Sequence, residues 1–501
     1  MILSELLYGA EVLKWDADPS SEIGGIASDS RKIKEGYAFV ALRGTRYDGN
    51  EFAADAARRG AAVIVTDRPG ERGISSVLVK NARSAEAFMW NNAAGDPTRG
   101  MTVIAVTGTN GKTSTCFMLK EIFAAAGRAA GVITTVGSFI CGRPVATGGG
   151  SSVSDADAAM TTPDPEIFYP AVAEMRDAGA DALIFEASSH ALDQRKLDPL
   201  RPDVAVFTNL TEEHLDYHGT MENYFLAKAR LAQRAGTLVI NASDPYLARL
   251  PDMFREKKTV RCFPAGETGQ GTDTVSALRR ELLGVDGVRY LYYSGRAVFP
   301  VCSPIPGAFT ISNTLLAAAA ALETGAEAGT VQRALMRMRG VPGRLEKIDV
   351  DAPFTVFVDY AHTPAALEEL LRTVRSFRVK GQRITVLFGC GGDRDRSKRR
   401  RMGAIASSLA DFTVVTSDNS RTEDPGSIIA EIVSGIDREK PYAVIPDRRD
   451  AIEYALSVAG CDDIVVLAGK GHEKYEINAG GKRPFDETEI VKRALARRAD
   501  Q

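Results

Sequence analysis

The sequence predicts an α/β protein of three domains, and three observations lead to this prediction. The chain is 501 residues long, more than one hydrophobic core ordinarily serves. Apolar residues make up 44% of it and charged residues 25%, the balance of a folded globular protein. Short apolar runs alternate with helix-like segments, and a polar turn follows each run. We expect domains at residues 1–97, 98–339 and 340–501.

The first domain is predicted from short strand-like runs. YAFVAL starts at Tyr37 and AAVIV starts at Ala61, and both are rich in residues that favour strands. Asp96-Pro97 and the following Arg99-Gly100 form a plausible linker because these residues interrupt regular structure. The first α/β domain is therefore expected to end near residue 97.

The other two domains are predicted from buried strands that precede helices. In the second domain these are VIAV, DALIFEA, VAVFTNL and TLVIN, starting at Val103, Asp181, Val204 and Thr237. Continuous apolar strands that alternate with helices are typical of a mainly parallel sheet covered on both faces. In the third domain TVFVDY, RITVLFG, FTVVTSD and DIVVLAG repeat the pattern, with polar residues directly after each strand. This predicts a C-terminal Rossmann-like domain with its ligands at the strand ends.

Charge and hydropathy exclude several classes of partner. The formal net charge is −3, which gives no field for nucleic acid or an anionic membrane. No apolar run approaches the roughly 18 residues of a membrane span, and MILSELLYGAEV lacks the basic start of a signal peptide. We expect a cytoplasmic protein without nucleic-acid or membrane partners. Six widely spaced cysteines indicate reduced thiols: Cys116, Cys141, Cys262, Cys302, Cys390 and Cys461.

A glycine turn follows the first strand of the second domain, in AVTGTNGKTS. The common phosphate-binding pattern has a glycine where Val106 stands here. Backbone N–H groups and the start of a helix favour an anion at such a turn. Lys112 adds a positive charge for terminal phosphates, and the Thr113 hydroxyl suits Mg²⁺. We expect a nucleotide triphosphate site with seven residues: Gly108, Thr109, Asn110, Gly111, Lys112, Thr113 and Ser114.

All five histidines lie just beyond predicted strands, where ligands bind in α/β sheets. They are His190, His214, His218, His362 and His472. Glu186 ends one strand and His214 follows the next, so both could reach the phosphate side of the glycine turn. Mg²⁺ prefers oxygen ligands, which makes Glu186 the first choice for a metal.

A series of motifs runs through the chain in a fixed order. They are GTNGKTS, TTPD, FEASSHAL, FTNLTEEHLDYHGTMENYFLAKARL, VPGRLE, VDYAHTPAALEE, FGCGGDRDRSKRR, DNSRTEDP and AGKGHEKYE. With DSRKIKEGYAFVALRGTRYDG near the N-terminus, they resemble the Mur ligases over essentially the whole chain. More narrowly, they are similar to the members that add the third residue of the peptidoglycan stem peptide.

The resemblance implies an ATP-dependent ligase of peptidoglycan synthesis, and so of cell-wall biogenesis, cell shape and cell division. It would add meso-diaminopimelate to UDP-N-acetylmuramoyl-L-alanyl-D-glutamate through an acyl phosphate, releasing ADP and phosphate. ATP and Mg²⁺ would be required, and the enzyme would be a monomer. The domains would be an N-terminal UDP-binding domain, a central P-loop ATPase domain and the Rossmann-like domain, which closes over the site.

The resemblance also implies roles for individual residues. The catalytic residues would be Lys112, Glu186, His214 and Lys228. The metal ligands would be Thr113, Glu186, His214 and Lys228, with Lys228 carbamylated. ATP would also meet Asn313, Arg344 and Asp359. The UDP-sugar peptide would meet Ser28, Ser30, Thr45, Tyr47, Thr161, Thr162, Ser188, Arg195 and Lys196. The amino acid would meet Arg394, Asp418, Asn419, Ser420, Arg421, Gly469 and Glu473.

The chain departs from the family pattern at several of these positions. Lys196 stands where an arginine is common, with Arg195 beside it, so either cation could contact the substrate. Ser420 replaces a usual proline and loosens the backbone that presents Arg421. The other departures are Asn50, Thr310 and Glu476. The alternatives are a ligase for L-lysine, a folylpolyglutamate synthase-type ligase, and a nucleotide-regulated binding protein without ligase activity.

Overall fold

The computed structural model describes residues 1–44, 47–69, 73–140, 143–144, 160–267, 271–338 and 340–499. The chain forms two compact units, which are described in turn. The first comprises Met1–Ser276, Tyr293–Ala297 and Asn313–Val331, and the second Ala277–Tyr292, Val298–Ser312 and Gln332–Gln501. The chain passes between them within α10 (Phe309–Glu323) and α11 (Ala328–Arg337). The predicted domain boundaries after residues 97 and 339 stay a prediction.

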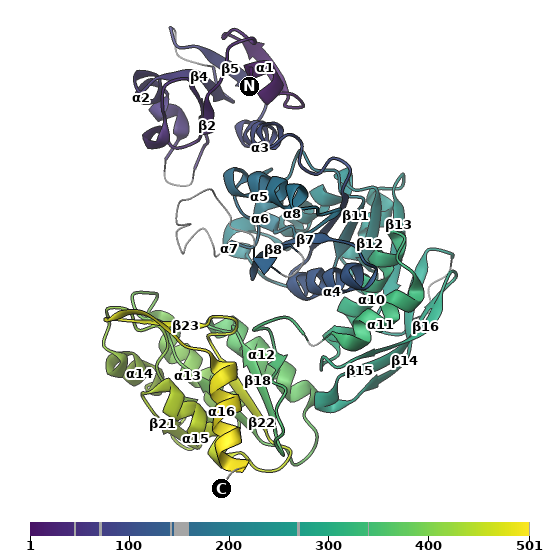
Figure 1. Ribbon diagram of the computed structural model, residues 1–501, viewed down its shortest axis with the longest axis vertical. Helices are drawn as coiled ribbons and strands as arrows, with labels where there is room; N and C mark the ends of the chain where they lie inside the picture. The colour runs from purple at the N-terminus through teal and green to yellow at the C-terminus, as the bar shows by residue number, and fades with distance from the viewer. Residues whose placement is uncertain are drawn as a thin grey trace. The chain divides into compact units, whose positions relative to one another are not determined.

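The N-terminal part of the first unit holds a five-stranded sheet (Figure 1). In spatial order its strands are β1 (Val12–Trp15), β5 (Ser76–Val79), β4 (Ala61–Thr66), β3 (Tyr37–Val40) and β2 (Gly25–Ala27). All neighbours are parallel except β1 and β5. Its helices are α1 (Leu3–Leu6), α2 (Ala53–Arg58) and α3 (Ala82–Ala93). Val63 and Val65 pack into one core and Ile64 into another, so both faces of the sheet are covered.

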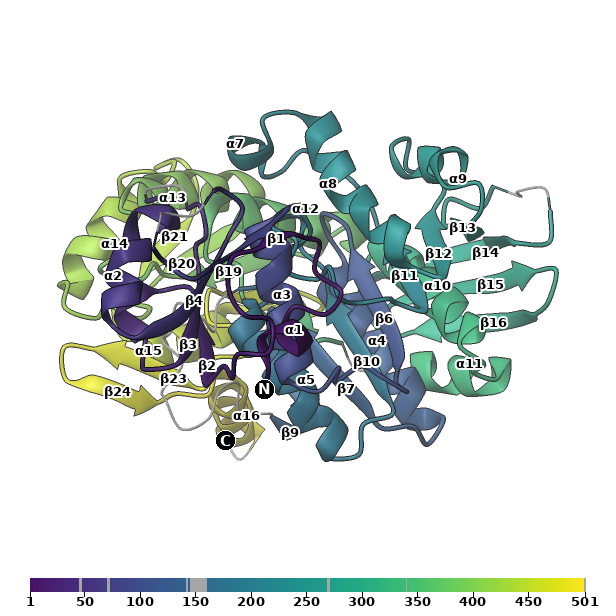
Figure 2. The same cartoon turned by 90° about the horizontal axis from the view of Figure 1, so that it is seen from above.

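The central sheet of the first unit is mainly parallel, as predicted. In spatial order, nine of the eleven strands of its sheet are β14 (Thr274–Leu282, of which only Thr274–Ser276 belong to this unit), β13 (Lys258–Phe263), β12 (Thr237–Asn241), β11 (Val204–Phe207), β6 (Thr102–Thr107), β10 (Ala182–Glu186), β7 (Ala130–Thr134), β8 (Gly137–Ile140) and β9 (Arg143–Pro144). β14 to β7 are parallel, and β8 and β9 are antiparallel additions. Figure 2 shows β11, β6, β10 and β7 side by side. β10 and β11 flank β6, so both bring their ends to the glycine turn.

Helices of the first unit pack on this sheet and present side chains at its strand ends. They include α4 (Lys112–Ala125), α5 (Pro165–Asp177), α6 (Ser189–Asp193), α7 (Leu215–His218), α8 (Met221–Arg234) and α9 (Leu250–Met253). α3 of the N-terminal part packs against α5, and Ala87 of α3 belongs to the same core as Phe168 of α5. The Thr220 hydroxyl caps α8 by accepting from Asn223 N at 3.1 Å. Lys228 therefore lies mid-helix, with 2% of its surface exposed.

The second unit holds a six-stranded sheet with helices on both faces. In spatial order its strands are β17 (Glu346–Lys347), β18 (Thr355–Asp359), β22 (Ile464–Ala468), β19 (Ile384–Phe388), β20 (Phe412–Val415) and β21 (Tyr442–Val444). β17 is antiparallel and the others are parallel. Alternate residues of β22 enter two separate cores, Val466 on one face and Val465 on the other. This confirms the predicted Rossmann-like architecture.

The helices of the second unit divide between those two cores. α12 (Pro364–Phe377), α13 (Ser397–Leu409) and α14 (Pro425–Val433) cover one face, and α15 (Arg448–Val458) and α16 (Glu487–Ala499) cover the other. A separate hairpin of β23 (Tyr475–Asn478) and β24 (Gly481–Pro484) follows β22. Most of β15 (Val288–Ser294) and all of β16 (Val298–Ser303) also belong to this unit.

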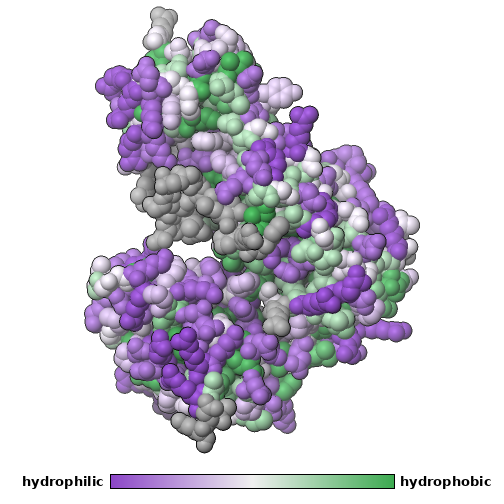
Figure 3. Space-filling view, viewed as in Figure 1, coloured by the Kyte–Doolittle hydropathy of each residue, from purple (hydrophilic) through white to green (hydrophobic). Residues whose placement is uncertain are grey.

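The hydropathy of the helices and the surface, and the state of the cysteines, can be compared with what the composition predicts. Among the described residues, no helix is long and apolar enough to cross a membrane. The face in Figure 3 is largely hydrophilic, with scattered apolar side chains. Five cysteines are free, namely Cys116, Cys262, Cys302, Cys390 and Cys461. Cys141 lies outside the described residues.

Candidate active site

The glycine turn between β6 and α4 is held in a conformation that side chains would prevent. Gly108 has φ +148°, and a Cβ added there would lie 1.9 Å from the Thr208 hydroxyl. Gly111 has φ +83°, and its Cβ would lie 2.4 Å from the Asn313 side-chain oxygen. Asn209 fixes the turn from β11 by accepting backbone N–H groups of the two intervening residues, Thr109 and Asn110, at 2.9 Å each. The turn is therefore preorganised, and Asn313 lies against it. The contact of Asn313 with ATP stays a prediction.

Two lysine ammonium groups converge on this turn. Lys112 Nζ donates to the carbonyl oxygens of Gly108 at 3.0 Å and Thr109 at 2.7 Å. Lys228 Nζ donates to the same Gly108 oxygen at 2.7 Å. Burial holds the pKa of Lys228 well below its usual range, and the positive charge of Lys112 lowers it further. The Lys228 amine is thereby poised to lose its proton.

Glu186, at the end of β10, is bound directly to the first turn of α4. Thr113 Oγ1 donates to Glu186 Oε1 at 2.7 Å, and Thr135 donates to both carboxyl oxygens through its N–H at 3.0 Å and its hydroxyl at 3.2 Å. Only 1% of Glu186 is exposed. Lys112, Thr113 and Glu186 thus belong to one site, and Ser114 follows them in α4. Thr135, after β7, is a member that sequence reasoning missed, because a lone threonine after a strand carries no distinctive pattern.

Three histidines gather beside the turn. His214 has φ +56° and its ring lies 4.9 Å from that of His190, centroid to centroid. The His190 ring lies 5.6 Å from that of His218, which hydrogen-bonds the Ser189 hydroxyl at 3.0 Å. Burial, followed by the neighbouring His214, lowers the pKa of His190. The neutral imidazole of His190 is therefore favoured.

These residues fit a magnesium ion in part. Thr113 Oγ1 and the Glu186 carboxylate are adjacent oxygen donors of the kind that Mg²⁺ prefers. Lysine as an ammonium ion cannot ligate a metal, but the lowered pKa of Lys228 favours the neutral amine that carbamylation requires. Among the residues that the structure describes, no group of three or more His, Cys, Asp or Glu side chains could hold a metal ion without such help.

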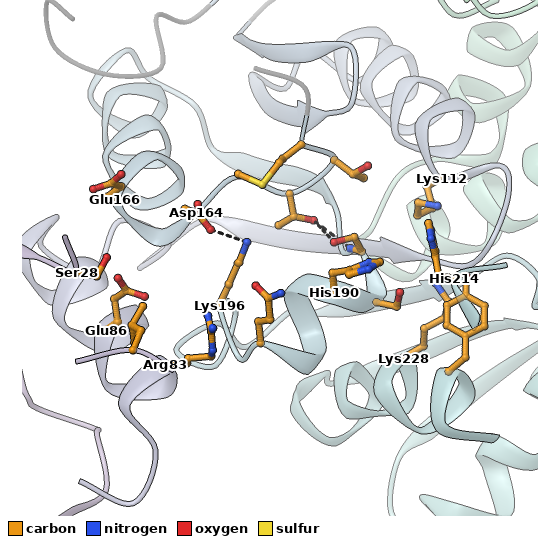
Figure 4. A pocket seen from close by; sticks show the side chains of 18 residues that line it. Ser28, Arg83, Glu86, Lys112, Asp164, Glu166, His190, Lys196, His214 and Lys228 are labelled. Carbon is orange, nitrogen blue, oxygen red and sulfur yellow. Dashed lines mark hydrogen bonds and ion pairs between the residues drawn. The ribbon is translucent and has the colours of Figure 1, made fainter. Parts of the chain in front are cut away.

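A cavity of about 550 Å³ extends from this turn toward the N-terminal part of the unit (Figure 4). Lys112, His214 and Lys228 lie at one end in Figure 4, and Ser28 and Glu86 at the other. The cavity is also lined by hydroxyl, amide and cationic side chains, namely Thr161, Thr162, Ser188, Ser189, Gln194 and Lys196, and by the carboxyl groups of Asp164 and Glu166. The cavity can therefore hold an elongated anionic ligand with its charged part near the lysines.

Two adjacent cations that follow the FEASSHAL segment, Arg195 and Lys196, line different cavities. Lys196 lines this cavity and pairs with Asp164 at 2.6 Å. Arg195 has φ +56°, pairs with Asp198 at 3.4 Å and lines a different cavity. Lys196 is accordingly the better candidate for a substrate contact, although its charge is already shared with a carboxylate.

The predicted uridine-contacting residues are only partly brought together. Ser28 lines the cavity. The hydroxyl of Ser30 bonds Asp55, and Tyr47 is 69% exposed, so neither lines the cavity as the structure describes it. Thr45 lies outside the described residues.

In the second unit, Asp418, Asn419 and Ser420 are buried directly after β20. Asn419 Nδ2 donates to Glu473 Oε2 at 2.9 Å, and Arg421 has φ +52° with its N–H donating to Ile477 O at 3.1 Å. The hairpin strand β23 therefore holds the loop that Ser420 could otherwise loosen.

The Arg421 guanidinium is anchored along one side. Its Nη1 donates to Gly392 O at 2.8 Å and more weakly to Asn419 O at 3.4 Å. Among the described residues, its Nε and Nη2 have no hydrogen-bond partner. The side chains of Arg421 and of the exposed Arg394 both lie within 4.0 Å of the position that a Cβ on Gly391 would take. The contact of Arg421 is its Nη1 at 3.0 Å, whereas that of Arg394 is its aliphatic Cγ at 4.0 Å.

Lys470 is the residue of this region that sequence reasoning missed. It is fully buried, and its Nζ donates to Asn419 Oδ1 at 3.1 Å and Tyr475 O at 2.9 Å, 3.5 Å from Asp418 Oδ1. Burial alone would raise the pKa of Asp418, but Arg448, Lys470 and the Asn419 N–H outweigh it and lower that pKa. Burial raises the pKa of Glu473. Gly469, at φ +115°, passes so close to Asp418 that a Cβ would meet its carboxylate at 2.9 Å.

Asp359 and Arg344 lie together in the second unit, at the end of β18. Asp359 accepts backbone N–H groups from Leu345 at 2.7 Å and Ala361 at 2.8 Å, and burial raises its pKa. Its carboxylate therefore fixes the VPGRLE segment in addition to any ligand contact. The Arg344 guanidinium lies 5.5 Å from the centre of the Tyr360 ring, a cation–π distance.

The chain is similar to known protein families and to individual known proteins. Three family profiles match the chain: Mur ligase family, catalytic domain, at residues 22–95; Mur ligase middle domain at 106–321; and Mur ligase, glutamate ligase domain, at 343–471. Two relatives carry the name UDP-N-acetylmuramoyl-L-alanyl-D-glutamate--2,6-diaminopimelate ligase. The one from Syntrophomonas wolfei is 38% identical over 99% of both chains, and the one from Bacillus cereus 38% over 95% of both.

Solved structures agree. A structure with that same ligase name is 30% identical, covers 100% of this chain and 99% of its own, and has a TM-score of 0.71. Mycobacterium tuberculosis folylpolyglutamate synthase complexed with ADP has a TM-score of 0.58 at 22% identity, covering 83% of this chain and 94% of its own, which shows a shared fold alone. The full-length similarity and the ordered motifs lead to one conclusion: the chain belongs to the Mur ligase family.

Proposed function

We propose that the protein is an ATP-dependent ligase that joins meso-diaminopimelate to UDP-N-acetylmuramoyl-L-alanyl-D-glutamate in peptidoglycan precursor synthesis. The observation that carries the proposal is the cavity that joins the phosphate-binding turn, through hydroxyl and cationic side chains, to Ser28. The relatives that match over the whole chain are named for this reaction. The proposal includes a cytoplasmic monomer that binds neither nucleic acid nor membrane.

The chain's own residues supply charge neutralisation and positioning. Lys112 leaves the loop carbonyls and meets the terminal phosphates of ATP, while the backbone N–H groups of the turn hold them in line with the substrate carboxylate. Asn313 and Arg344 would contact the nucleotide. Thr162, Ser188 and Lys196 orient the UDP-linked peptide, since hydroxyls and a cation bind phosphate and carbonyl oxygens.

Magnesium would be held by Thr113, Glu186, His214 and carbamylated Lys228, and would neutralise the phosphoryl charge when bound. Glu186 keeps this side of the turn negative, and the depressed pKa of Lys228 supports its modification. Without carbamylation, Lys228 stays a second cation bound to the Gly108 carbonyl.

The choice of diaminopimelate rests on Arg421. Diaminopimelate carries a distal carboxylate that lysine lacks, and a guanidinium binds such a group with two parallel charge-assisted hydrogen bonds. The Nε and Nη2 of Arg421, which no described residue binds, suit this contact, with Arg394 as a second cation. Gly469 and Glu473 suit the distal ammonium, with Asn419 bonded to Glu473 and Asp418 lying against Gly469.

An amine-dependent phosphate-release assay tests the proposal. Purified enzyme with ATP, Mg²⁺ and UDP-N-acetylmuramoyl-L-alanyl-D-glutamate should release phosphate far faster with meso-diaminopimelate than with L-lysine or L-glutamate. A preference for L-lysine would show that the enzyme adds L-lysine instead of diaminopimelate. Phosphate release only with a folate substrate and glutamate would overturn it.

A further inference from the structure

Glu86 is a buried acid that none of the roles above uses. It lies on α3, with 8% of its surface exposed, and lines the cavity at the end opposite Lys112 (Figure 4). In Figure 4 its carboxyl group lies near Ser28 and Arg83. A carboxyl group in such a position is costly to bury unless it binds something.

The charged groups around Glu86 come from two elements, α3 and the start of α5. Arg83 lies one turn earlier on α3, and Asp164 and Glu166 face it from the start of α5. Both of those acids have their own cations, since Lys196 lies 2.6 Å from Asp164 and Lys32 lies 3.2 Å from Glu166. Lys196 and Lys32 are therefore paired with carboxyl groups other than that of Glu86.

The Ser28 hydroxyl is the one hydrogen-bond partner of Glu86 among the described residues. A carboxyl group has lone pairs for several donors, so acceptor capacity is left over. Burial raises the pKa of Glu86 to about 7; the Ser28 hydrogen bond opposes this rise, while Asp164 and Glu166 add to it. Burial destabilises the ionised form of Glu86. An N–H donor from a ligand would stabilise that form through a hydrogen bond.

The chemistry of this end of the cavity selects one part of a UDP-linked substrate. A carboxylate repels phosphates and carboxylates, which belong near Lys112, Lys228 and Lys196. It attracts neutral groups with N–H donors, and the uracil ring carries one such group, its imide N–H. Ser28, the partner of Glu86, already lies in the stretch expected to meet uridine.

Resting on the proposed function, we propose that Glu86 is a binding residue for the nucleoside end of the substrate, where its carboxylate accepts the uracil imide N–H. Binding then requires ionised Glu86. The diphosphate linkage and the imide do not titrate between pH 6 and 8, so the requirement shows as a change in affinity with pH. With a pKa of about 7 in the free protein, the dissociation constant should rise about tenfold from pH 8 to pH 6.

Calorimetric titration of the full-length protein with UDP-N-acetylmuramoyl-L-alanyl-D-glutamate at pH 6, 7 and 8 tests this. Wild type should show the tenfold change, and Glu86→Gln about twofold or less. Glu166→Gln is the matched control, because it removes a second acid of the cavity that is paired with Lys32; it should keep the tenfold change.

A second arm uses the same ligand methylated at uracil N3, which cannot donate. At pH 8 it should bind wild type about tenfold or more weakly than the parent ligand and should show no dependence on Glu86. A Glu86→Gln profile as steep as wild type, or equal binding of the methylated ligand, would overturn the inference. Failure of wild type to bind the parent ligand at any pH would instead overturn the proposed function. Circular dichroism of each variant establishes that it is folded.

Discussion

Arg421 gives the sharpest prediction about substrate choice. Its Nη1 is anchored to Gly392 O at 2.8 Å, and we expect the Nε and Nη2 edge to bind the distal carboxylate of the substrate. Two charge-assisted hydrogen bonds contribute about 1.5–3 kcal/mol each, so Arg421→Ala should cost about 3–6 kcal/mol of transition-state binding for meso-diaminopimelate. This corresponds to a fall in kcat/KM of roughly two to four orders of magnitude.

The assay is steady-state phosphate release with meso-diaminopimelate and L-lysine at fixed ATP and UDP-linked substrate. Arg421→Ala should lose its preference because lysine never made the contact. Arg421→Lys should recover only part of the loss, since an ammonium group is not a planar fork. Arg400→Ala, which removes an exposed arginine of α13, serves as a matched control for loss of positive charge. An Arg421→Ala enzyme that still favours diaminopimelate would refute the reasoning.

Three further predictions concern buried ionisable groups. Lys228→Met should fold but lose about two orders of magnitude in kcat, and intact-mass analysis of wild type should show a carboxyl group added at Lys228; a bare amine in active enzyme would contradict this. The raised pKa of Glu86 means that its stabilising contribution is full below pH 4.5 and is lost as pH rises through about 7, a loss of about 3 kcal/mol. Urea unfolding should therefore show Glu86→Gln gaining stability relative to wild type between pH 4.5 and 8, and a constant difference would oppose the assignment. Lys470→Met should destabilise the protein by about 3–5 kcal/mol and raise the KM for the amino acid, because it leaves Asp418 buried without that cation. An unchanged KM would show that Lys470 does not contribute to binding the amino acid.

The local sequence pattern was sufficient to predict the strands and the glycine turn. The apolar runs before Gly108 and Gly469 became β6 and β22, because a buried parallel strand needs apolar residues on both faces. Glu186 was correctly expected at a strand end beside the turn, since the parallel order of β6 and β10 fixes its place.

Contacts between distant segments could not be predicted in this way. Arg195 and Lys196 are adjacent in sequence but face different cavities, and the positive φ of Arg195 that separates them has no sequence signal. Lys470 would ordinarily be assigned to the surface, yet it lies buried against Asn419, 51 positions earlier. Glu86 likewise depends on α3 packing against α5, which only the folded chain reveals.

The central claim is that the outermost phosphoryl group of ATP is transferred to the substrate carboxylate before the amine attacks. The most direct test uses UDP-N-acetylmuramoyl-L-alanyl-D-glutamate labelled with ¹⁸O in the carboxylate that forms the new amide bond. Transfer through an acyl phosphate moves one labelled oxygen into each phosphate released, as mass spectrometry of the phosphate would show. Phosphate that carries no label while the amide product forms would contradict the account.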